Sequence, residues 1–482
     1  MAEDLKHKTA GTLKWNTIDR LASQVLYAVV GIVLANLISQ EDFGLAGALL
    51  VFQAFANLFV DSGFGAAIIQ KKNPTEQDYS TVFWFNLGTA CVIYLILFLC
   101  APLIADIFQS DTRLISLSKV MFLTFIFTAV GLVQTVKMMK QMDVKQIAIA
   151  NVVAQCTGGA LGIYLAVTGR GPWALVWQSV TQAAVKSAWL WAKGHWWPGS
   201  PFSIDSLRQM WRLALSVFSS SALNTFFLYI YSFVIGAFYN LVSLGVYTQA
   251  DKWSKMGSAS ISQVMTASFV PVLSKYQDDP DHYRQCMRRI NRFCAMIVFP
   301  ALLGLAVTGT PLFHALFGDK WDAAIILFQI LSVRGVFVVL ISLMSNYMLA
   351  LGYGKRIFKL EIIKDVSTIV ALLATVWSGS LMWLVTGQLA ASVLTWAVTL
   401  GIVSRASGYR VWGFLRDLLP FAAATLVGCL LAGTILLTDL NPWIQLIAIL
   451  AIGLLSYMCI LAVARVPELK EALSSLRQRP VR

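Results

Sequence analysis

Long apolar segments, separated by short polar connections, run along the whole chain. A helix needs about 20 mainly apolar residues to cross a bilayer. Fourteen such windows fall near residues 15–38, 43–66, 79–105, 114–136, 146–168, 172–192, 214–238, 243–270, 293–310, 323–349, 357–377, 380–403, 415–437 and 442–464. Because lipid satisfies no backbone polar group, segments of this length form helices. The pattern therefore predicts an all-α polytopic membrane protein with about 14 transmembrane helices.

Lys and Arg are distributed unevenly among the connections between these windows. Twenty-seven of them lie in the N-terminal segment, the even-numbered connections and the C-terminal segment, whereas the odd-numbered connections hold only Arg113, Arg170 and Lys320. Connections rich in Lys and Arg stay on the cytoplasmic side of a membrane. This alternation predicts a multi-pass protein with both termini in the cytoplasm.

Composition agrees with lipid as the main solvent. Only 13% of the residues are charged and 58% are hydrophobic, whereas soluble domains carry about 25% charged residues. The net charge of +13 comes from short basic clusters between apolar runs, which indicates membrane topology and no nucleic-acid partner. The first window contains Asp19 and Arg20 and leads directly into further windows, so we expect a retained helix and no cleaved signal peptide.

Residues suited to catalysis or metal binding are scattered. The seven cysteines lie mostly in apolar segments without metal-ligand spacing, and the four histidines lie mainly in connections or near the ends. No connection predicted to lie outside is long enough for a catalytic domain, and no nucleophile–base arrangement is visible. We therefore expect no enzymatic activity, no cofactor and no metal site.

Two short segments of the first half recur in the second half. Residues 102–108 resemble residues 311–317, and Phe43-Gly44-Leu45 corresponds to Leu244-Gly245-Val246. The offsets span six helices, so both halves would have the same orientation, and transporters built from such repeats bind substrate between them. The predicted organisation is an N-lobe at 1–200, a C-lobe at 201–405, two further helices at 406–465 and a cytoplasmic tail at 466–482.

Twelve charged residues lie more than three residues inside the ends of the predicted spans. A charge at mid-bilayer depth costs about 2.5–3.5 kcal/mol on insertion scales, so these residues should face the protein interior or a hydrated cavity. The basic residues are Arg20, Lys119, Lys186, Lys252, Lys255, Arg334 and Lys364, and the acidic residues are Asp19, Asp61, Asp251, Glu361 and Asp365.

Polar residues also recur at helical spacing in several windows, which places them on one face of each helix. These sets come from both halves of the chain, as a central hydrated cavity requires. They are Asn16, Arg20, Ser23 and Tyr27; Gln53, Asn57 and Asp61; Gln178, Gln182 and Lys186; and Thr248, Asp251, Lys255, Ser258 and Ser262.

Some of these charges have alternative explanations. Lys364 stands beside Glu361 and Asp365 and can pair locally, and Lys119 lies near a helix end and can snorkel to the surface. Asp251 and Lys255 stand at i and i+4 and can form a structural pair. A pair between Arg20 and Asp61 across the first two helices is equally open.

Arg334 and Lys186 differ because neither has an acidic partner on its own helix. Arg334 lies about eleven residues into its window, with no acid within four positions. A buried cation without a carboxylate attracts an anion, and an anionic substrate can supply it. The predicted substrate-binding residues are Arg334, Lys186, Arg20, Lys255 and Lys252, and the predicted coupling or gating residues are Asp61 and Asp251.

Four short motifs carry a resemblance to a known family. They are Leu37-Ile38-Ser39-Gln40-Glu41-Asp42-Phe43-Gly44; Asp61-Ser62-Gly63-Phe64-Gly65 with Ile69-Gln70-Lys71; Gly169-Arg170-Gly171-Pro172-Trp173-Ala174-Leu175; and Leu244-Gly245-Val246-Tyr247-Thr248-Gln249-Ala250. Together, over residues from about 10 to 405, the chain resembles the polysaccharide-transport (Wzx-type) branch of the multidrug/oligosaccharidyl-lipid/polysaccharide exporter (MOP) superfamily.

This resemblance implies two six-helix lobes around a central cavity, with two appended C-terminal helices, in a bacterial inner membrane. It also implies a substrate, an anionic polyprenyl-diphosphate glycolipid, specifically an undecaprenyl-diphosphate-linked oligosaccharide flipped to the outer leaflet. Association with glycan polymerase machinery is a further implication. Lys and Arg along the path would lower the barrier for a diphosphate.

One position departs from the family pattern. Many relatives carry an acid in the seventh helix, five residues before an Ile-Gly glycine, and here Tyr231 occupies that position. A coupling role of that acid therefore does not transfer to this chain. The alternative function is a cation-coupled multidrug exporter of the same superfamily. Organic cations favour acidic cavities, whereas the bases inside these spans outnumber the acids.

Overall fold

The computed structural model describes residues 2–109 and 111–469, and these residues form helices and no strand. Every predicted window coincides with one helix or with two consecutive helices. The elements are α1 (Ala2–Leu37), α2 (Gln40–Asp61), α3 (Phe64–Gln70), α4 (Glu76–Leu99), α5 (Ala101–Ile107), α6 (Arg113–Met121), α7 (Leu123–Lys140), α8 (Val144–Val167), α9 (Trp173–Gly194), α10 (Ile204–Phe238), α11 (Leu241–Ser274), α12 (Pro280–Val307), α13 (Gly309–Phe317), η1 (Asp319–Trp321), α14 (Asp322–Ala350), α15 (Gly354–Val376), α16 (Leu381–Ser407), α17 (Val411–Gly433), η2 (Thr434–Leu437) and α18 (Pro442–Val463).

Eleven spans among the described residues are long and apolar enough to cross a membrane. The chain is therefore a multi-pass membrane protein. The windows at 172–192, 243–270 and 357–377 coincide with α9, α11 and α15, which are helical but fall outside that group. α11 and α15 carry several charges each, whereas α9 combines Lys186 with several Gln, Ser, Thr and Trp residues that lower its mean hydropathy. The count of 14 spans stays a prediction.

Several windows are divided by a break in the helix. Ser62 and Gly63 both adopt the left-handed backbone conformation, with φ of 49° and 71°, and separate α2 from α3. An added Cβ at Gly63 would lie 2.3 Å from the carbonyl oxygen of Ala214 in α10. Glycine is required here both by its φ and by the close approach of α10.

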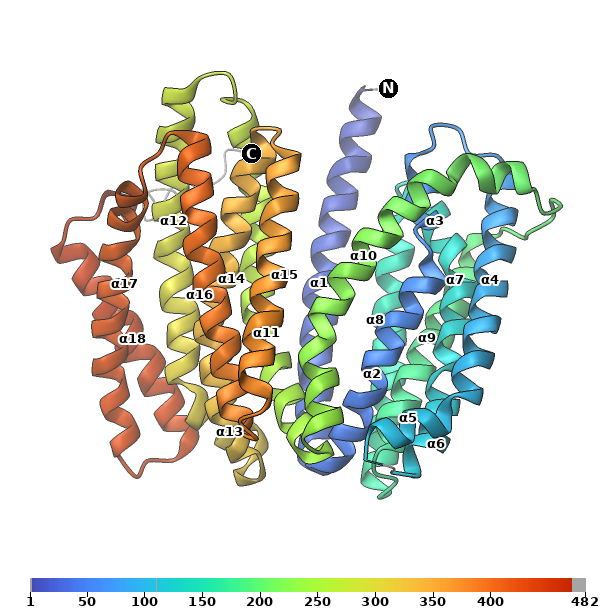
Figure 1. Ribbon diagram of the computed structural model, residues 1–482, viewed down its shortest axis with the longest axis horizontal. Coiled ribbons are helices and arrows are strands. Elements are labelled where there is room, and N and C mark those ends of the chain that lie inside the picture. Colours follow the sequence, from blue (N-terminus) through green and yellow to red (C-terminus); the bar gives the residue numbers. More distant parts are fainter. Residues whose placement is uncertain (1, 110, 470–482) are drawn as a thin grey trace. The chain divides into compact units, whose positions relative to one another are not determined.

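The described residues form two compact units, the first ending at Gly245 and the second beginning at Val246. In the first unit α8 packs against α1 and α9, α7 packs against α4 and α9, and α10 packs along α2 and α3 (Figure 1). Phe64, Val82 and Val133 form part of its buried core. The unit includes α10, whereas the lobes predicted from sequence repetition divide at residue 200; the lobe assignment stays a prediction.

In the second unit α14 packs against α12 and α16, and α17 packs against α12 and α18 (Figure 1). Two apolar clusters hold these helices together. One contains Tyr283, Tyr347 and Phe414, and the other contains Val339 and Phe421. The short helices α5 and α13, which contain the repeated segments, each follow a long helix, α4 in the first unit and α12 in the second.

The beginnings of α2 and α11 approach each other through the repeated glycines. An added Cβ at Gly44 would lie 1.8 Å from the carbonyl oxygen of Leu241, and one at Gly245 would lie 2.0 Å from that of Gln40. Neither glycine can therefore carry a side chain without moving backbone. The two motifs that correspond in the sequence repeat thus pack directly against one another.

We predict that Gly245→Ala destabilises the protein by at least about 1–3 kcal/mol, the usual cost of overpacking. The measurement is the apparent Tm of the detergent-purified protein. Gly88→Ala in α4 is the matched control, because no atom outside its local helix lies within 4 Å of an added Cβ. Equal apparent Tm values for the two variants would contradict the close contact.

Charged residues join α12 to α17 and to the segment after α18. Asp417 is only 2% exposed, and its carboxylate lies 3.3 Å from Nε of Arg288 and 3.9 Å from Nη1 of Arg292. Arg292 also forms an ion pair with Glu468. Burial alone would raise the pKa of Glu468, but the hydrogen bond and charge of Arg292 hold that pKa below its ordinary value.

We predict that Glu468→Gln lowers the apparent Tm at pH 7 and that this difference narrows in acid. A carboxyl whose folded-state pKa is lowered stabilises the fold above its unfolded pKa of about 4.3 and loses that effect as the pH falls further. Thermal unfolding of both proteins from pH 7 down to about pH 2.5, below the folded-state pKa of Glu468, measures the difference. A gap that stays constant over this range would show that the ion pair contributes nothing.

Candidate functional site

Two predicted site residues, Asp61 and Lys186, line one cavity inside the first unit. This cavity has a volume of about 360 Å³ and is bounded by α2, α3, α7 and α9. Thr128, Gly131 and Ser187 line it as well. An added Cβ at Gly131 would lie 2.5 Å from Oγ of Ser187, so this glycine lets α7 and α9 pack closely beside the cavity.

Asp61 and Lys186 share the cavity without a direct ion pair. Within the described part of the chain, no carboxylate oxygen lies within 4.0 Å of the Lys186 ammonium. Asp19 of α1 lies close enough for its charge to act on Lys186 as well. An acid and a base that face the same space without direct contact can each interact with water, an ion or a substrate there.

Asp19 is held by neutral hydrogen-bond donors. Its carboxylate accepts hydrogen bonds from Nδ2 of Asn151 in α8, at 3.0 and 3.2 Å, and from Oγ of Ser23, at 3.2 Å. These contacts fix the acid between α1 and α8, and α8 packs against α9. The sequence placed Asp19 inside a predicted span but gave no reason to connect it with Lys186. Such a connection can be seen only when it is known which helices pack together.

Arg334 lies in α14 of the second unit and is half-buried. Its Nε donates a hydrogen bond to Oγ of Ser392 in α16 at 3.0 Å. Among the residues described in this unit, no carboxylate forms an ion pair with its guanidinium. The predicted lack of an acidic neighbour along the helix thus extends to the three-dimensional surroundings within the unit.

The charged residues of α11 are arranged differently. Lys255 forms an ion pair with Asp251 at 2.6 Å, the structural alternative that the i and i+4 spacing had left open. The other oxygen of Asp251 is buried without a hydrogen-bond partner among the described residues. Lys252 is half-buried, with its ammonium 5.4 Å from the ring centroid of Trp253. Because a carboxylate already neutralises Lys255, this residue is a weaker candidate for substrate contact than Arg334.

The predicted local pairing of Lys364 is confirmed, whereas the snorkelling of Lys119 and the pairing of Arg20 stay predictions. Lys364 forms an ion pair with Glu361, and its ammonium lies 4.0 Å from Asp365. The ammonium of Lys119 lies 4.5 Å from the ring centroid of Phe98. Arg20 is exposed, and its pairing with Asp61 stays a prediction.

A larger cavity lies in the second unit, away from these charged residues. It measures about 460 Å³ and is lined mainly by apolar residues of α12, α17 and α18, including Pro300, Cys429 and Tyr457. It contains none of the predicted site residues. Its apolar lining suits hydrocarbon, whereas the smaller cavity with Asp61 and Lys186 offers charge.

The sequence pattern of one protein family matches residues 33–326, and that family is described as polysaccharide biosynthesis protein. The match covers more than half of the chain. This chain belongs to the polysaccharide biosynthesis protein family. The predicted resemblance to the polysaccharide-transport branch is thereby confirmed.

Two curated relatives of this family member extend the match to most of its length. The teichuronic acid biosynthesis protein TuaB of Bacillus subtilis is 23% identical over 460 residues, covering 94% of each chain. The lipopolysaccharide biosynthesis protein WzxC of Escherichia coli is 26% identical over 338 residues, covering 69% of this chain and 68% of that protein.

Solved structures share the fold. The lipid II flippase MurJ, in an inward closed conformation, aligns with a TM-score of 0.74 at 15% identity, covering 93% of this chain and 98% of MurJ. An inward-facing multidrug resistance MATE family transporter of the MOP superfamily aligns with a TM-score of 0.62 at 16% identity, covering 80% and 96%. At these identities the likeness establishes the fold alone.

We predict that the effects of Asp61→Asn and Lys186→Gln on stability are not additive. Either single change leaves the opposite charge in the shared cavity less well compensated, so the double variant should be more stable than the sum predicts, by about 0.5–3 kcal/mol. Thermal unfolding of the four proteins measures this coupling.

Lys119→Gln combined with Asp61→Asn is the matched control. Lys119 lies in the same unit but does not line the cavity, so its effect should add to that of Asp61→Asn. Additivity in both pairs would refute an electrostatic coupling across the cavity.

Proposed function

We propose that this family member flips an undecaprenyl-diphosphate-linked oligosaccharide from the cytoplasmic to the outer leaflet of a bacterial inner membrane by alternating access. The oligosaccharide would be an exopolysaccharide, capsule or O-antigen unit. In this proposal the protein transports its substrate without catalysing a covalent reaction. Both termini would lie in the cytoplasm, and the protein would function beside the glycan polymerase machinery.

The proposal rests mainly on one observation, that Arg334 and Lys186 lack an ion-paired carboxylate partner among the described residues of their own units. Both cations belong to helices embedded among the spans, and within their own units no described carboxylate forms an ion pair with either one. A diphosphate is the complementary ligand, because charge-assisted hydrogen bonds to phosphate are strong where water is scarce.

Family membership supports the substrate class. TuaB is named for teichuronic acid biosynthesis and WzxC for lipopolysaccharide biosynthesis, and MurJ is named as a flippase of lipid II. We infer that the 14 helices form two six-helix lobes around a central cavity, with α17 and α18 appended. Arg334, Lys186, Arg20, Lys255 and Lys252 would contact substrate there, and Asp61 and Asp251 would take part in coupling or gating.

The competing proposal is a cation-coupled multidrug exporter. The MATE fold similarity and the exposed Asp61 in its cavity favour it. An organic cation would be repelled by Arg334 and Lys186, however, and attracted only where carboxylates outnumber bases. A deletion strain separates the two functions: loss of surface glycan indicates the flippase, and hypersensitivity to cationic dyes with normal glycan indicates the exporter.

We predict that Arg334→Ala lowers surface glycan display about tenfold or more while the protein still inserts and accumulates normally. A hydrogen bond to a charged group contributes about 1.5–3 kcal/mol, which corresponds to this range. The measurement is glycan display in a deletion strain that carries the variant, normalised to the amount of protein in the membrane.

Lys364→Ala is the control, because Lys364 pairs with Glu361 on its own helix and should leave display unchanged. Arg334→Lys should retain part of the activity because it keeps the charge. Wild-type display by a well-expressed Arg334→Ala protein would count against the proposed role.

A further inference from the structure

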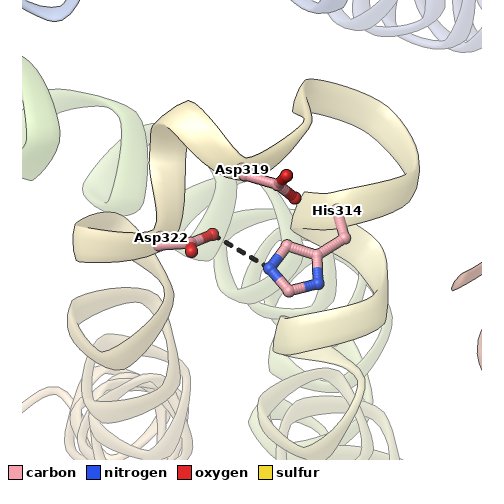
Figure 2. A group of neighbouring side chains, drawn as sticks. All are labelled: His314, Asp319 and Asp322. Atoms are coloured by element: carbon pink, nitrogen blue, oxygen red, sulfur yellow. Dashed lines mark hydrogen bonds and ion pairs between the residues drawn. The ribbon is translucent and has the colours of Figure 1, made fainter. Parts of the chain in front are cut away.

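Three potential metal ligands gather at the turn between α13 and α14. His314 lies near the end of α13, Asp319 begins η1, and Asp322 is the first residue of α14. One ligand atom from each lies within 4.8 Å of the other two, and Nε2 of His314 is 2.9 Å from Oδ1 of Asp322. Figure 2 shows both carboxylates beside the imidazole ring at this turn.

The turn that presents these side chains is rigidly anchored. Gly318 has φ of 71°, a left-handed conformation that reverses the chain between His314 and Asp319 at little cost for glycine. Trp321 is only 1% exposed. The ring centroid of Phe317 lies 5.3 Å from that of Trp253. Buried aromatic side chains therefore fix the backbone on both sides of the three ligands, as a preformed site requires.

The ligands themselves remain accessible to solvent. The side chain of His314 is 30% exposed and that of Asp322 is 59% exposed. The carboxylate of Asp319 forms no hydrogen bond or ion pair with any described residue. An ion from solution could thus reach the turn, and Asp319 is available to bind it without breaking an existing contact.

The chemistry of the three side chains selects a class of ion. Two carboxylates balance a divalent charge, and imidazole favours borderline transition metals over Mg²⁺ or Ca²⁺. Ligands about 2.1 Å from a zinc ion lie about 3.4 Å apart in tetrahedral geometry, which small side-chain rotations reach from the observed separations. We propose that His314, Asp319 and Asp322 bind a Zn²⁺ ion that clamps α13 to α14.

This proposal does not depend on the transport function. The connection that contains Lys320 is one of those predicted to lie outside the cytoplasm, so the ion would come from the external solution. Neither the spacing of the cysteines nor that of the histidines predicted this site, because its ligands become neighbours only when Gly318 reverses the chain.

A simpler explanation is a structural ion pair. A histidine at the end of one helix and an aspartate at the beginning of the next are each favoured by the helix dipole, and their hydrogen bond alone could join α13 to α14. In that case Asp319 would have no role, and a thiol at position 314 could not replace the imidazole.

The experiment measures Zn²⁺ binding to the full-length chain, purified in detergent with a tag that contains no histidine. We expect about one tightly held Zn²⁺ per chain after desalting, by elemental analysis, and a chelator-reversible rise in apparent Tm. Co²⁺ should give the visible absorption of a site with nitrogen and oxygen ligands. The absence of saturable Zn²⁺ binding, or equally tight binding of Ca²⁺ or Mg²⁺, would overturn the proposal.

Variants assign the ion to these side chains. His314→Ala and Asp319→Asn should each weaken Zn²⁺ binding at least about tenfold, the lower limit for loss of even an outer-shell partner. Because the Asp319 side chain has no described partner, Asp319→Asn should fold normally and keeps the test valid if His314→Ala does not. His314→Cys should retain Zn²⁺, since a thiolate is also a zinc ligand.

His282→Ala is the matched control. His282 is likewise an exposed histidine whose Nδ1 lies 2.7 Å from an aspartate, Asp279, but the described residues bring no third ligand to it. This variant should bind Zn²⁺ as the wild type does. Equal binding by wild type and Asp319→Asn, or equal losses in His314→Ala and His282→Ala, would refute the site.

Discussion

A charged side chain on a helix that crosses a bilayer must find a partner within the protein or reach water, because leaving it in hydrocarbon is costly. This constraint accounts for most of the charges in the described spans. Lys364 pairs with Glu361, Lys255 with Asp251, and Arg292 with both Asp417 and Glu468. Arg334 and Lys186 stand apart, since Arg334 has a neutral hydroxyl partner and Lys186 faces a cavity. These two cations are the physical basis of the proposed function.

The same constraint applies to α9, α11 and α15, the long helices that fall outside the eleven apolar spans. Each carries charges that lipid would not tolerate, so each needs protein or water on that face. For α9 the surroundings are visible: α8 packs along it, and the cavity with Asp61 receives Lys186. The polar helices are thus where a hydrated path is easiest to form.

Local features of this chain could be predicted from the sequence, and features that depend on helix packing could not. Window lengths predicted the helices, and the spacing of Asp251 and Lys255 indicated that they could form an ion pair. The break between α2 and α3 was not predicted. Ser62 and Gly63 end α2 there by adopting the left-handed backbone conformation. The Asp417 cluster and the cavity shared by Asp61 and Lys186 join residues more than 100 positions apart. Hydrophobic periodicity does not specify which helices become neighbours, so such contacts lie beyond it.

The repeated glycine motifs allow the beginnings of α2 and α11 to pack closely. Gly44 and Gly245 correspond in the repeat, and each permits a backbone contact at the other motif. Short motifs that characterise this family therefore encode close packing at the beginnings of α2 and α11. The residues of this packing contact differ from the charged residues proposed to bind substrate.

The central claim is that cations without carboxylate partners in the spanning helices bind the diphosphate of a lipid-linked sugar. The most direct measurement compares the affinity of the wild-type protein in nanodiscs for a polyprenyl-diphosphate oligosaccharide and for the same oligosaccharide on an uncharged polyprenol. The account predicts at least about tenfold tighter binding of the diphosphate, the effect of a charged hydrogen bond, with the preference weakening as salt increases. Equal affinity for the charged and uncharged lipids would contradict it.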